Sequence, residues 1–450
     1  MELKKYKLGE ILDVTRGASL SGEFYATEGK YIRLTCGNFD YQNNCFKENK
    51  SKDNLYYIGD FKPEFLMEEG DIITPLTEQA IGLLGSTAII PESGKYIQSQ
   101  DVAKIICKEE LLDKDCAFYL ISSTLVKQQL SAAAQQTKIR HTSPDKIRDC
   151  TVWIPELTEQ KRIGKLLRSL DRKIELNRAI NQNLEAMAKQ LYDYWFVQFD
   201  FPNEEGKPYK SSGGTMVWSE KLKRNIPTNW ETAELGNTCE ILLGGTPDTG
   251  NEIYWGGSYS WLNSGEVAEF PILKSEKTIT EEGLNSSATA YAQKGSVTLS
   301  ITRHLRPSIL AIDACINQSV VAIKETDEIR KEYLYPLINR EVPRFMTLRT
   351  GAQQPHINKE TVESTWITIP TSDILNKYYT IVSPIYCSII ENAIEIENLI
   401  MQRDELLPLL MNGQVSVNSD LAAILPTFVL PSFYLLIDGH IPIKSKLLQQ

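Results

Sequence analysis

Apolar residues recur at three- and four-residue steps from residue 157 to about residue 200, which predicts one long helix. The apolar positions are Ile163, Leu167, Leu170, Ile174, Leu184, Ala188, Leu191 and Trp195. Their mean spacing is close to the 3.5 residues of a helix that lies along another helix. Asn177 and Asn181 occupy the middle of this seam, where a buried polar residue can fix the register of pairing. At 1.5 Å per residue, about 44 residues would make a spacer helix of roughly 65 Å with a helical partner.

A second helix with the same spacing is expected over residues 372–411. Its seam positions are Ile374, Tyr378, Ile381, Ile385, Ile389, Asn392, Ile396, Leu399, Leu406 and Leu410. Residues 385–412 hold five acidic residues against Arg403 alone, whereas residues 157–178 hold seven basic residues against three acidic ones. An antiparallel pair would bring these opposite charges together, and a parallel pair would not. We therefore predict that the two helices pack antiparallel.

Two β-rich blocks, residues 1–156 and 229–371, consist of short apolar segments broken by turns. Four anchors of the first block recur in order in the second, at separations that fall from 228 to 215 residues. The matched anchors are Leu34 and Gly37 with Leu262 and Gly265, Gly70 with Gly295, Gln100 with Gln318, and Ile154-Pro155 with Ile369-Pro370. A falling separation is expected when loops shorten in one copy. The sequence therefore predicts an internal duplication.

The predicted organisation is block one (1–156), first helix (157–200), linker (201–228), block two (229–371), second helix (372–412) and a tail (413–450). The linker is rich in Pro, Gly, Ser and Lys, which is typical of an exposed connection. The tail contains "LAAILPTFVLPSFYLLI", which is apolar but holds two prolines and is short for a membrane span. No function is assigned to it.

The composition bears on three properties: metal binding, the redox state of the thiols and the affinity for nucleic acid. The eight cysteines stand apart without a C-x-x-C pair, and the four histidines show no metal-ligand spacing. Since the N-terminus also lacks an apolar signal region, we expect reduced thiols in a cytoplasmic protein without metal. The net charge of −10 argues against nucleic acid at first sight. The uneven distribution of charge along the chain weakens that argument.

Most catalytic signatures are missing from the sequence. There is no G-x-G-x-x-G, Walker A loop, G-x-S-x-G elbow or Asn-Pro-Pro-aromatic segment. A nuclease-like string occurs, with Pro144-Asp145 followed by Glu159 and Lys161. In such nucleases the second carboxylate and the lysine lie on a strand, but here they open a long helix on different faces.

Polar and basic clusters end both blocks, "AAAQQTKIRHTSPDKIR" in the first and "RTGAQQPHINKETV" in the second, and "ITRHLRPS" adds a third. Gln and Asn can bind adenine bidentately, Arg can bind guanine, and Lys, Ser and Thr can hold phosphates. The clusters recur at matching places in the two copies, which favours DNA contact over solvated loops. The candidate DNA-binding residues are Arg16, Arg33, Gln135, Gln136, Lys138, Arg140, His141, Thr246, Trp261, Arg303, His304, Arg306, Gln353, Gln354 and His356.

Four segments resemble the specificity subunit of type I restriction–modification systems. "LLGGTPDTGNEIYWGGSYSWLNSGEV" (242–267) resembles the opening of a target recognition domain, and "IPELTEQKRIGKLLRSLDRKIELNRAINQNLE" (154–185) resembles the first repeated helical region. "WFVQFDFP" (195–202) and "RDELLPLLMNGQVSV" (403–417) resemble the ends of the two helical regions. The first block departs from the family, having "TRGASLSGEFY" (15–25) in place of a G-G-T-P opening.

The resemblance implies an α+β fold: two β-rich target recognition domains separated by two long helices in an antiparallel coiled coil, with an internal pseudo-twofold duplication. It implies that each domain reads one half of a split site in double-stranded DNA, and that the helices dock two methyltransferase subunits, which motor and nuclease subunits then join. No cofactor is expected in this chain, and the partner subunits would use S-adenosylmethionine, ATP and Mg²⁺. Two alternatives are an enzyme with its own nuclease or methyltransferase site, and a coiled-coil scaffold whose blocks bind protein.

Overall fold

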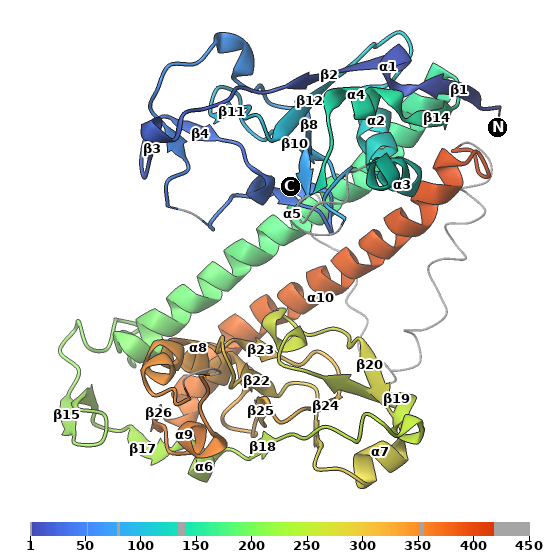
Figure 1. The fold of residues 1–450 in the computed structure, drawn as a ribbon. Helices are drawn as coiled ribbons and strands as arrows, with labels where there is room; N and C mark the ends of the chain where they lie inside the picture. The colour runs from blue at the N-terminus through green and yellow to red at the C-terminus, as the bar shows by residue number, and fades with distance from the viewer. Residues whose placement is uncertain (1, 52, 79–81, 134–139, 352–354, 418–450) are drawn as a thin grey trace, which may run out of the picture. The chain divides into compact units, whose positions relative to one another are not determined.

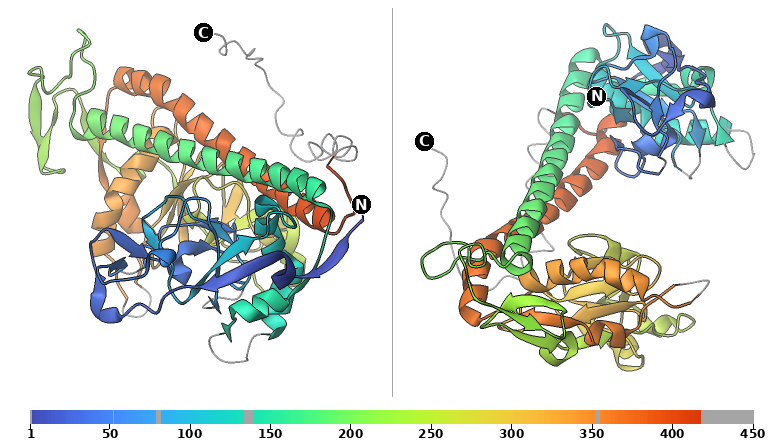
Figure 2. Two further views of the ribbon diagram at one scale, coloured as in Figure 1. Left: turned by 90° about the horizontal axis from the view of Figure 1, so that it is seen from above. Right: turned by 90° about the vertical axis from the view of Figure 1, so that its left-hand side faces the viewer.

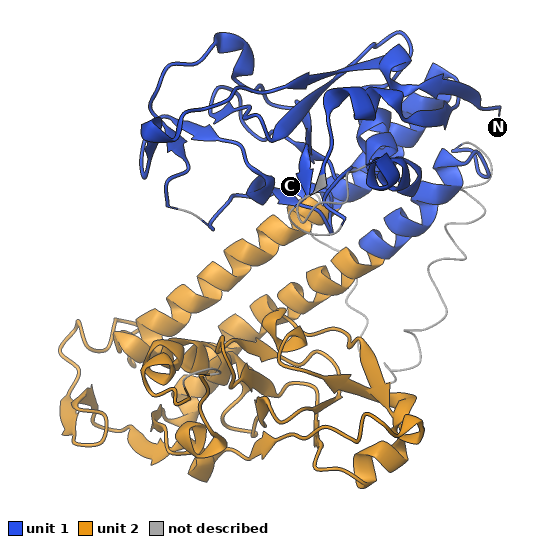
Figure 3. Cartoon of the chain, in the orientation of Figure 1, with its two compact units in different colours: residues 1–173, 399–450 blue, residues 174–398 orange. Residues whose placement is uncertain are grey.

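The computed structural model describes residues 2–51, 53–78, 82–133, 140–351 and 355–417 (Figure 1). The chain divides into two compact units, residues 1–173 with 399–450 and residues 174–398 (Figure 3). The long helices α5 (Leu157–Tyr192) and α10 (Ser372–Met411) each contribute residues to both units. The first unit is therefore discontinuous in sequence and is completed by residues from the end of α10, whereas the second unit is one continuous segment.

In the first unit an antiparallel sheet of order β10-β8-β12-β2 lies beside a mixed sheet of order β11-β4-β7-β3. All four residues of β8 are buried, as expected for a central strand covered on both faces. The strands of these sheets are β2 (Leu12–Arg16), β3 (Tyr25–Ala26), β4 (Tyr31–Arg33), β7 (Tyr56–Tyr57), β8 (Ile72–Pro75), β10 (Ala88–Ile89), β11 (Tyr96–Ile97) and β12 (Val102–Cys107). The paired strands are β1 (Lys4–Lys7) with β14 (Thr151–Ile154), β5 (Phe39–Asp40) with β6 (Cys45–Phe46), and β9 (Thr77–Glu78) with β13 (Arg140–His141).

Short helices complete the first unit and pack its sheet against the long helices. They are α1 (Leu8–Ile11), α2 (Lys114–Ile121), α3 (Thr124–Ala133) and α4 (Pro144–Asp149), with 3-10 turns at Gly22–Phe24, Cys36–Asn38 and Pro63–Phe65. Asp113 caps α2 by accepting a hydrogen bond from the Cys116 amide at 3.0 Å. Ile163 and Leu167 of α5 and Leu406 and Leu410 of α10 are buried in the same core as these helices.

The second unit repeats this plan, with sheets of order β18-β25-β22-β23 and β20-β19-β24-β21. Its strands are β15 (Met216–Ser219), β16 (Arg224–Pro227), β17 (Glu231–Glu234), β18 (Ile241–Leu243), β19 (Trp255–Leu262), β20 (Lys277–Ile279), β21 (Ala290–Ala292), β22 (Val297–Ser300), β23 (Pro307–Ile309), β24 (Ala314–Ile316), β25 (Val320–Ile323) and β26 (Trp366–Ile369). Its helices are α6 (Leu235–Thr238), α7 (Glu281–Asn285), α8 (Lys331–Thr347) and α9 (Lys359–Glu363), with 3-10 turns at Glu252–Tyr254 and Glu266–Ala268.

The two units share one topology, which confirms the predicted duplication. The antiparallel pair β1–β14 corresponds to β17–β26, and the parallel pair β4–β11 corresponds to β19–β24. The structure also fixes the alignment of the first block's opening. The Ala18 amide donates to the Gln98 carbonyl at 3.0 Å, as the Gly245 amide does to the Ile316 carbonyl at 3.0 Å. Ala18 is therefore the counterpart of Gly245.

The two long helices run antiparallel wherever they meet, as predicted from their charges (Figure 2). In the second unit Asn181 donates to the Ile389 carbonyl at 3.0 Å and accepts from Asn392 at 2.9 Å. Asn177 donates to Glu395 at 2.8 Å, so rising residue numbers in α5 meet falling numbers in α10. Both α5 asparagines are buried, in agreement with the polar seam positions expected from the sequence.

Several details differ from the sequence-based expectations. Regular α-helix ends at Tyr192 and is followed by a π-helical turn, Asp193–Val197, whereas the pattern predicted helix to about residue 200. In α10 the predicted seam residue Ile381 is 47% exposed and its neighbour Val382 is fully buried instead. The buried ion pair between the helices has the reverse of the expected polarity, with Arg403 on α10 and Asp171 on α5.

The predicted linker 201–228 has structure of its own, because β15 and β16 form a hairpin within it. Asp200 also accepts hydrogen bonds from the Ser211 amide and hydroxyl, both at 2.7 Å. The domain boundaries given by the sequence stay predictions. Of the predicted tail, residues 418–450 lie outside the described residues. Among the described helices, none combines the length and the apolar character that crossing a bilayer requires.

Candidate nucleic-acid interface

In the second unit, three chain segments meet at one end of the sheet β18-β25-β22-β23. Leu243 at the end of β18 pairs with Val321, and Ser300 at the end of β22 pairs with Val320. Both strands therefore end where β25 begins. This register places the loops after β18 and β22 beside the turn before β25.

Hydrogen bonds join these segments to the loop between α8 and α9. Thr246 donates to the Gln318 side-chain oxygen at 2.5 Å, which joins the loop after β18 to the turn before β25. The Arg303 amide donates to the Pro355 carbonyl at 2.9 Å, and the Ile357 amide to the Ile301 carbonyl at 3.0 Å. We call the surface formed by residues 244–248, 301–306, 317–319 and 355–357 the second edge surface.

The second edge surface is rich in exposed hydrogen-bond donors. Arg303, His304, Arg306 and His356 are all exposed, and Arg349 donates to the Arg303 carbonyl at 2.9 Å. Arg303 adopts a φ of 55°, a left-handed conformation that is unusual for a residue with a side chain. Such conformations are concentrated at functional sites. The candidate residues of three separate sequence segments are therefore brought together on one basic surface.

The first unit has an equivalent surface at the same end of its own sheet. Arg16 donates from Nε to the Gln100 carbonyl at 2.8 Å. His141 pairs with Thr77 in the ladder β13–β9, just as His356 bridges to Thr302. We call residues 16–19, 76–78, 98–100 and 141–142 the first edge surface.

Some candidate residues cannot be placed on these surfaces. Gln135, Gln136 and Lys138 of the first block, and Gln353 and Gln354 of the second, lie outside the described residues. The backbone of Arg140 belongs to β13, and its side chain is likewise outside the description.

Arg33 and Trp261 occupy equivalent buried positions in β4 and β19, and neither side chain is exposed on an edge surface. Arg33 is 7% exposed, and its guanidinium lies 3.9 Å from the centre of the Tyr25 ring. Trp261 is 6% exposed and donates to the Gly245 carbonyl at 3.3 Å. Both side chains pack inside their unit, which suits a supporting role. Direct DNA contact by either residue stays a prediction that this burial does not favour.

Sequence reasoning missed Gln100 and Gln318 as site residues and used them only to align the two copies. Both are exposed in the turns that precede β12 and β25. The signal that could have found them is a polar, amide-bearing residue repeated at a strand-to-strand turn, since glutamine can hydrogen-bond to base edges.

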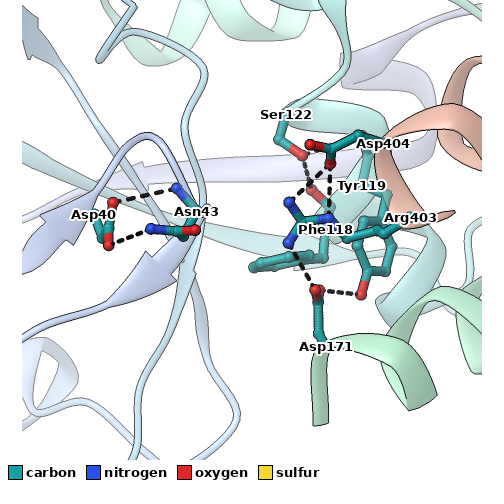
Figure 4. A network of polar contacts seen from close by, with 8 residues as sticks. All are labelled: Asp40, Asn43, Phe118, Tyr119, Ser122, Asp171, Arg403 and Asp404. Carbon is teal, nitrogen blue, oxygen red and sulfur yellow. Dashed lines mark hydrogen bonds and ion pairs between the residues drawn. The ribbon is translucent and has the colours of Figure 1, made fainter. Parts of the chain in front are cut away.

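A buried polar network in the first unit ties α2 to both long helices (Figure 4). Asp171 of α5 accepts from Arg403 of α10 at 2.9 Å and from the Tyr119 hydroxyl of α2 at 2.5 Å. Arg403 also pairs with Asp404 at 2.8 Å. Burial and the charge of Asp171 together raise the pKa of Tyr119. Burial alone would lower the pKa of Arg403, but Asp171 and Asp404 raise it, so this arginine stays charged.

The two carboxylates of the nuclease-like string take part in other contacts. Asp145 forms an ion pair with Arg148 at 2.7 Å on α4, and Glu159 accepts from the Val417 amide at 3.0 Å. In the part of the chain that the structure describes, no three His, Cys, Asp or Glu side chains are grouped to hold a metal ion.

Comparison with known proteins identifies the family. The model of the type I restriction modification DNA specificity domain matches residues 1–186 and 227–400, and the chain belongs to this family. The two matched segments correspond to the two copies of the duplication.

Curated relatives are similar over most of their length. The type I restriction enzyme MjaIX specificity subunit of Methanocaldococcus jannaschii is 23% identical over 71% of this chain and 73% of the relative. The HindI specificity subunit of Haemophilus influenzae is 23% identical over 60% of this chain and 70% of the relative. A crystal structure of a type I restriction-modification S subunit from M. genitalium covers 91% of this chain and 96% of its own, with a TM-score of 0.57 and 15% identity. This last likeness shows a shared fold.

Proposed function

We propose that this chain is the sequence-specific DNA-recognition subunit of a type I restriction–modification complex, and that each block reads one half of a bipartite site. One observation carries the proposal: an edge surface of the same construction occurs in both units, at the same end of equivalent sheets. Membership of the family and the names of the relatives support it.

The chemistry of the edge surfaces suits DNA. Exposed arginines such as Arg303 and Arg306 can neutralise phosphates or bind guanine, and Gln318 can hydrogen-bond to a base edge. The hydrogen bond from Thr246 holds the Gln318 side chain in one orientation, which lowers the entropy lost when it meets a base.

Random-site selection with the assembled complex tests this proposal. The wild type should select two fixed half-sites separated by an unread spacer. Replacing Arg303 and Arg306 with alanine should relax the half-site read by the second block and leave the other half-site unchanged. Loss of one good base contact costs about 1–3 kcal/mol of discrimination.

A matched control is Lys324→Ala. Lys324 is exposed and follows β25 at the opposite end of the same sheet, where it pairs with Glu240 at 3.5 Å. Its replacement should leave both half-sites intact. Selection of no common sequence by the wild-type complex would instead favour the alternative of a protein-binding scaffold.

We further propose that the chain is not itself an enzyme. Two methyltransferase subunits would dock on the helices, and motor and nuclease subunits would join them. S-adenosylmethionine, ATP and Mg²⁺ would then belong to those partners. The names of the relatives as specificity subunits and the missing catalytic signatures support this division. The purified chain should transfer no methyl group from labelled S-adenosylmethionine and should cleave no DNA with Mg²⁺ and ATP. Native mass spectrometry of the complex should give two methyltransferase subunits per chain, because the chain is duplicated.

A further inference from the structure

Among the described residues, three basic side chains at the start of α5 form no ion pair with the acidic residues of α10. Antiparallel packing was expected to place them against acidic residues of α10. The buried ion pair between the helices in the first unit instead joins Asp171 and Arg403. Lys161, Lys165 and Arg172 are exposed, and they have no ion-pair partner among the residues that the structure describes.

These residues lie on one face of the helix. Positions 161, 165 and 172 are four and seven residues apart, and Arg168 completes the spacing between them. Eleven residues of helix extend about 16 Å, which is roughly the rise of five base pairs of DNA. We call Lys161, Lys165, Arg168 and Arg172 the basic face.

The basic face should weaken the helix that carries it. Lys161 and Lys165 stand four residues apart, and like charges at this spacing repel. Lys161 also lies close to the N-terminus of a helix that begins at Leu157, where the positive end of the helix dipole disfavours cations. Exposed charges that oppose their own helix are therefore not explained by folding.

The duplication indicates what kind of ligand they meet. The helices begin at equivalent positions, Leu157 and Ser372, so the basic face corresponds to residues 376, 380, 383 and 387 of α10. Those positions hold Asn376, Thr380, Ser383 and Cys387, which are uncharged. If two identical subunits docked equivalently on the two helices, only one of them would contact the basic face. Docking of such a pair therefore does not explain why one copy is basic and the other uncharged.

We infer that the basic face binds the phosphate backbone of DNA alongside the half-site read by the first block. This inference rests on the proposed function and adds to it a second, sequence-independent contact in one half of the protein. Lysine and arginine side chains about one helical turn apart complement a run of phosphates, and contacts of this kind position a protein without reading bases. The DNA affinity of the first half of the protein would then depend more strongly on salt concentration than that of the second half.

Substitution of three residues in the assembled complex tests the inference. Lys161→Gln, Lys165→Gln and Arg172→Gln together should lower affinity for specific and random duplexes alike. Each phosphate contact contributes about 0.9 to the slope of log affinity against log salt, so the slope should become shallower by about 2.7. DNA affinity is measured by fluorescence anisotropy at salt concentrations from about 50 to about 200 mM, and the slope is taken from these values.

Two further variants sharpen the test. Lys95→Gln, Lys207→Gln and Lys223→Gln remove the same charge from lysines that pair with Glu92, Glu205 and Glu220, and should leave the slope unchanged. Asn376→Lys, Thr380→Lys and Cys387→Lys build a basic face on the second copy, and should steepen the slope by a similar amount.

The outcomes are separable. An unchanged slope in the first variant overturns the inference, and loss of methyltransferase assembly with an unchanged slope assigns the face to a protein partner instead. Since the substitutions remove repulsion, the melting temperature should hold or rise, and a marked fall would show a structural role and overturn the inference. The half-sites selected by the variant should match those of the wild type. Failure of the proposed function itself would appear in the wild type, as selection of no common site.

Discussion

At the scale of single residues, one glycine in each block sets the position of the loop that follows β2 in the first unit and β18 in the second. A Cβ atom on Gly244 would lie 1.9 Å from the Ile316 carbonyl oxygen, and one on Gly17 would lie 2.3 Å from the Gln98 carbonyl oxygen. Real contacts of this kind are never so short, and backbone cannot yield as a flexible side chain does. The loop that carries Thr246 therefore sits where it does because residue 244 has no side chain.

Gly244→Ala should accordingly displace this loop and lower the free energy of unfolding by about 1–3 kcal/mol, as overpacking does. In site selection the half-site read by the second block should relax. Gly250→Ala is the control in the same loop, because its nearest neighbour would be the Asp248 carboxylate at an ordinary 3.4 Å. Equal effects of the two substitutions would show that the close approach at residue 244 is unimportant.

Arg403 is the second residue whose removal should be costly. Arg403→Met leaves Asp171 buried beside Tyr119 without its cationic partner, and breaking a buried pair from one side costs about 3–5 kcal/mol. Replacing all three residues together (Arg403→Met, Asp171→Leu and Tyr119→Phe) should recover most of this loss, because no charge is left buried. Chemical denaturation of the full chain measures both. A triple variant as unstable as the single one would assign the stability to packing rather than to charge.

Glu185 on α5 gives a pH-dependent prediction. Burial raises its pKa above the ordinary value of 4.5, so the folded state holds its proton more tightly than the unfolded state. Its ionised form therefore destabilises the fold at neutral pH, and this penalty shrinks as pH falls through the raised pKa. Glu185→Gln should raise the melting temperature at pH 7, and the gain should diminish towards pH 4.5. A gain that is independent of pH would rule out titration of Glu185 as its cause.

At the scale of elements, the long helices were predictable and the edge surfaces were only partly so. The period of the apolar seam follows from local helix geometry, which is why α10 was expected over residues 372–411 and is found there. That Val382 rather than Ile381 is buried in the core was not predictable, because both residues are apolar and only tertiary packing selects between them.

Which residues reach the edge surfaces depended on packing as well. Arg33 and Trp261 resemble good DNA-contacting residues by type, yet each fills the interior of its unit. The hairpin of β15 and β16 escaped notice because its short strands are flanked by residues typical of loops. Residue type predicts the average exposure of a side chain, but it does not predict which individual polar or aromatic side chain is buried in a particular core.

The helices also predict how the spacing of the two half-sites is set. Inserting four residues after Asn181 in α5 and four residues before Asn392 in α10 adds one turn to each helix while keeping the rest of the seam in register. The added length of roughly 6 Å should lengthen the unread spacer by one or two base pairs, with both half-site sequences unchanged. Site selection provides the measurement.

Insertion of two residues in each helix is the control. It rotates the seam by about 200°, which exposes the apolar face and should prevent assembly of the complex. A four-residue variant that selects different bases at the original spacing would show that the helices do not set the distance.

At the scale of the whole molecule, the duplication predicts that specificity is modular. Exchanging residues 1–156 for the corresponding block of a relative should change one half of the selected site and preserve the other. The core of the first unit includes Ile163 and Leu167 of α5, so the donor block must have an apolar surface that packs against these two residues. Donors with tyrosine at the position of Tyr119 should keep the contact with Asp171 and give the more stable chimaeras. Changes in both half-sites would contradict independent reading.

The discontinuity of the first unit has a consequence for how the protein is made. Its core needs Leu406, Leu410 and Val415, which leave the ribosome only after the whole of segment 174–398 has been translated. At a translation rate of roughly 5–20 residues per second, the residues from the end of α10 that complete this core are synthesised on the order of 10–45 s after the first block. During synthesis the core of the first block therefore stays incomplete for longer than the core of the second. A premature stop near residue 400 would harm the block that was synthesised first.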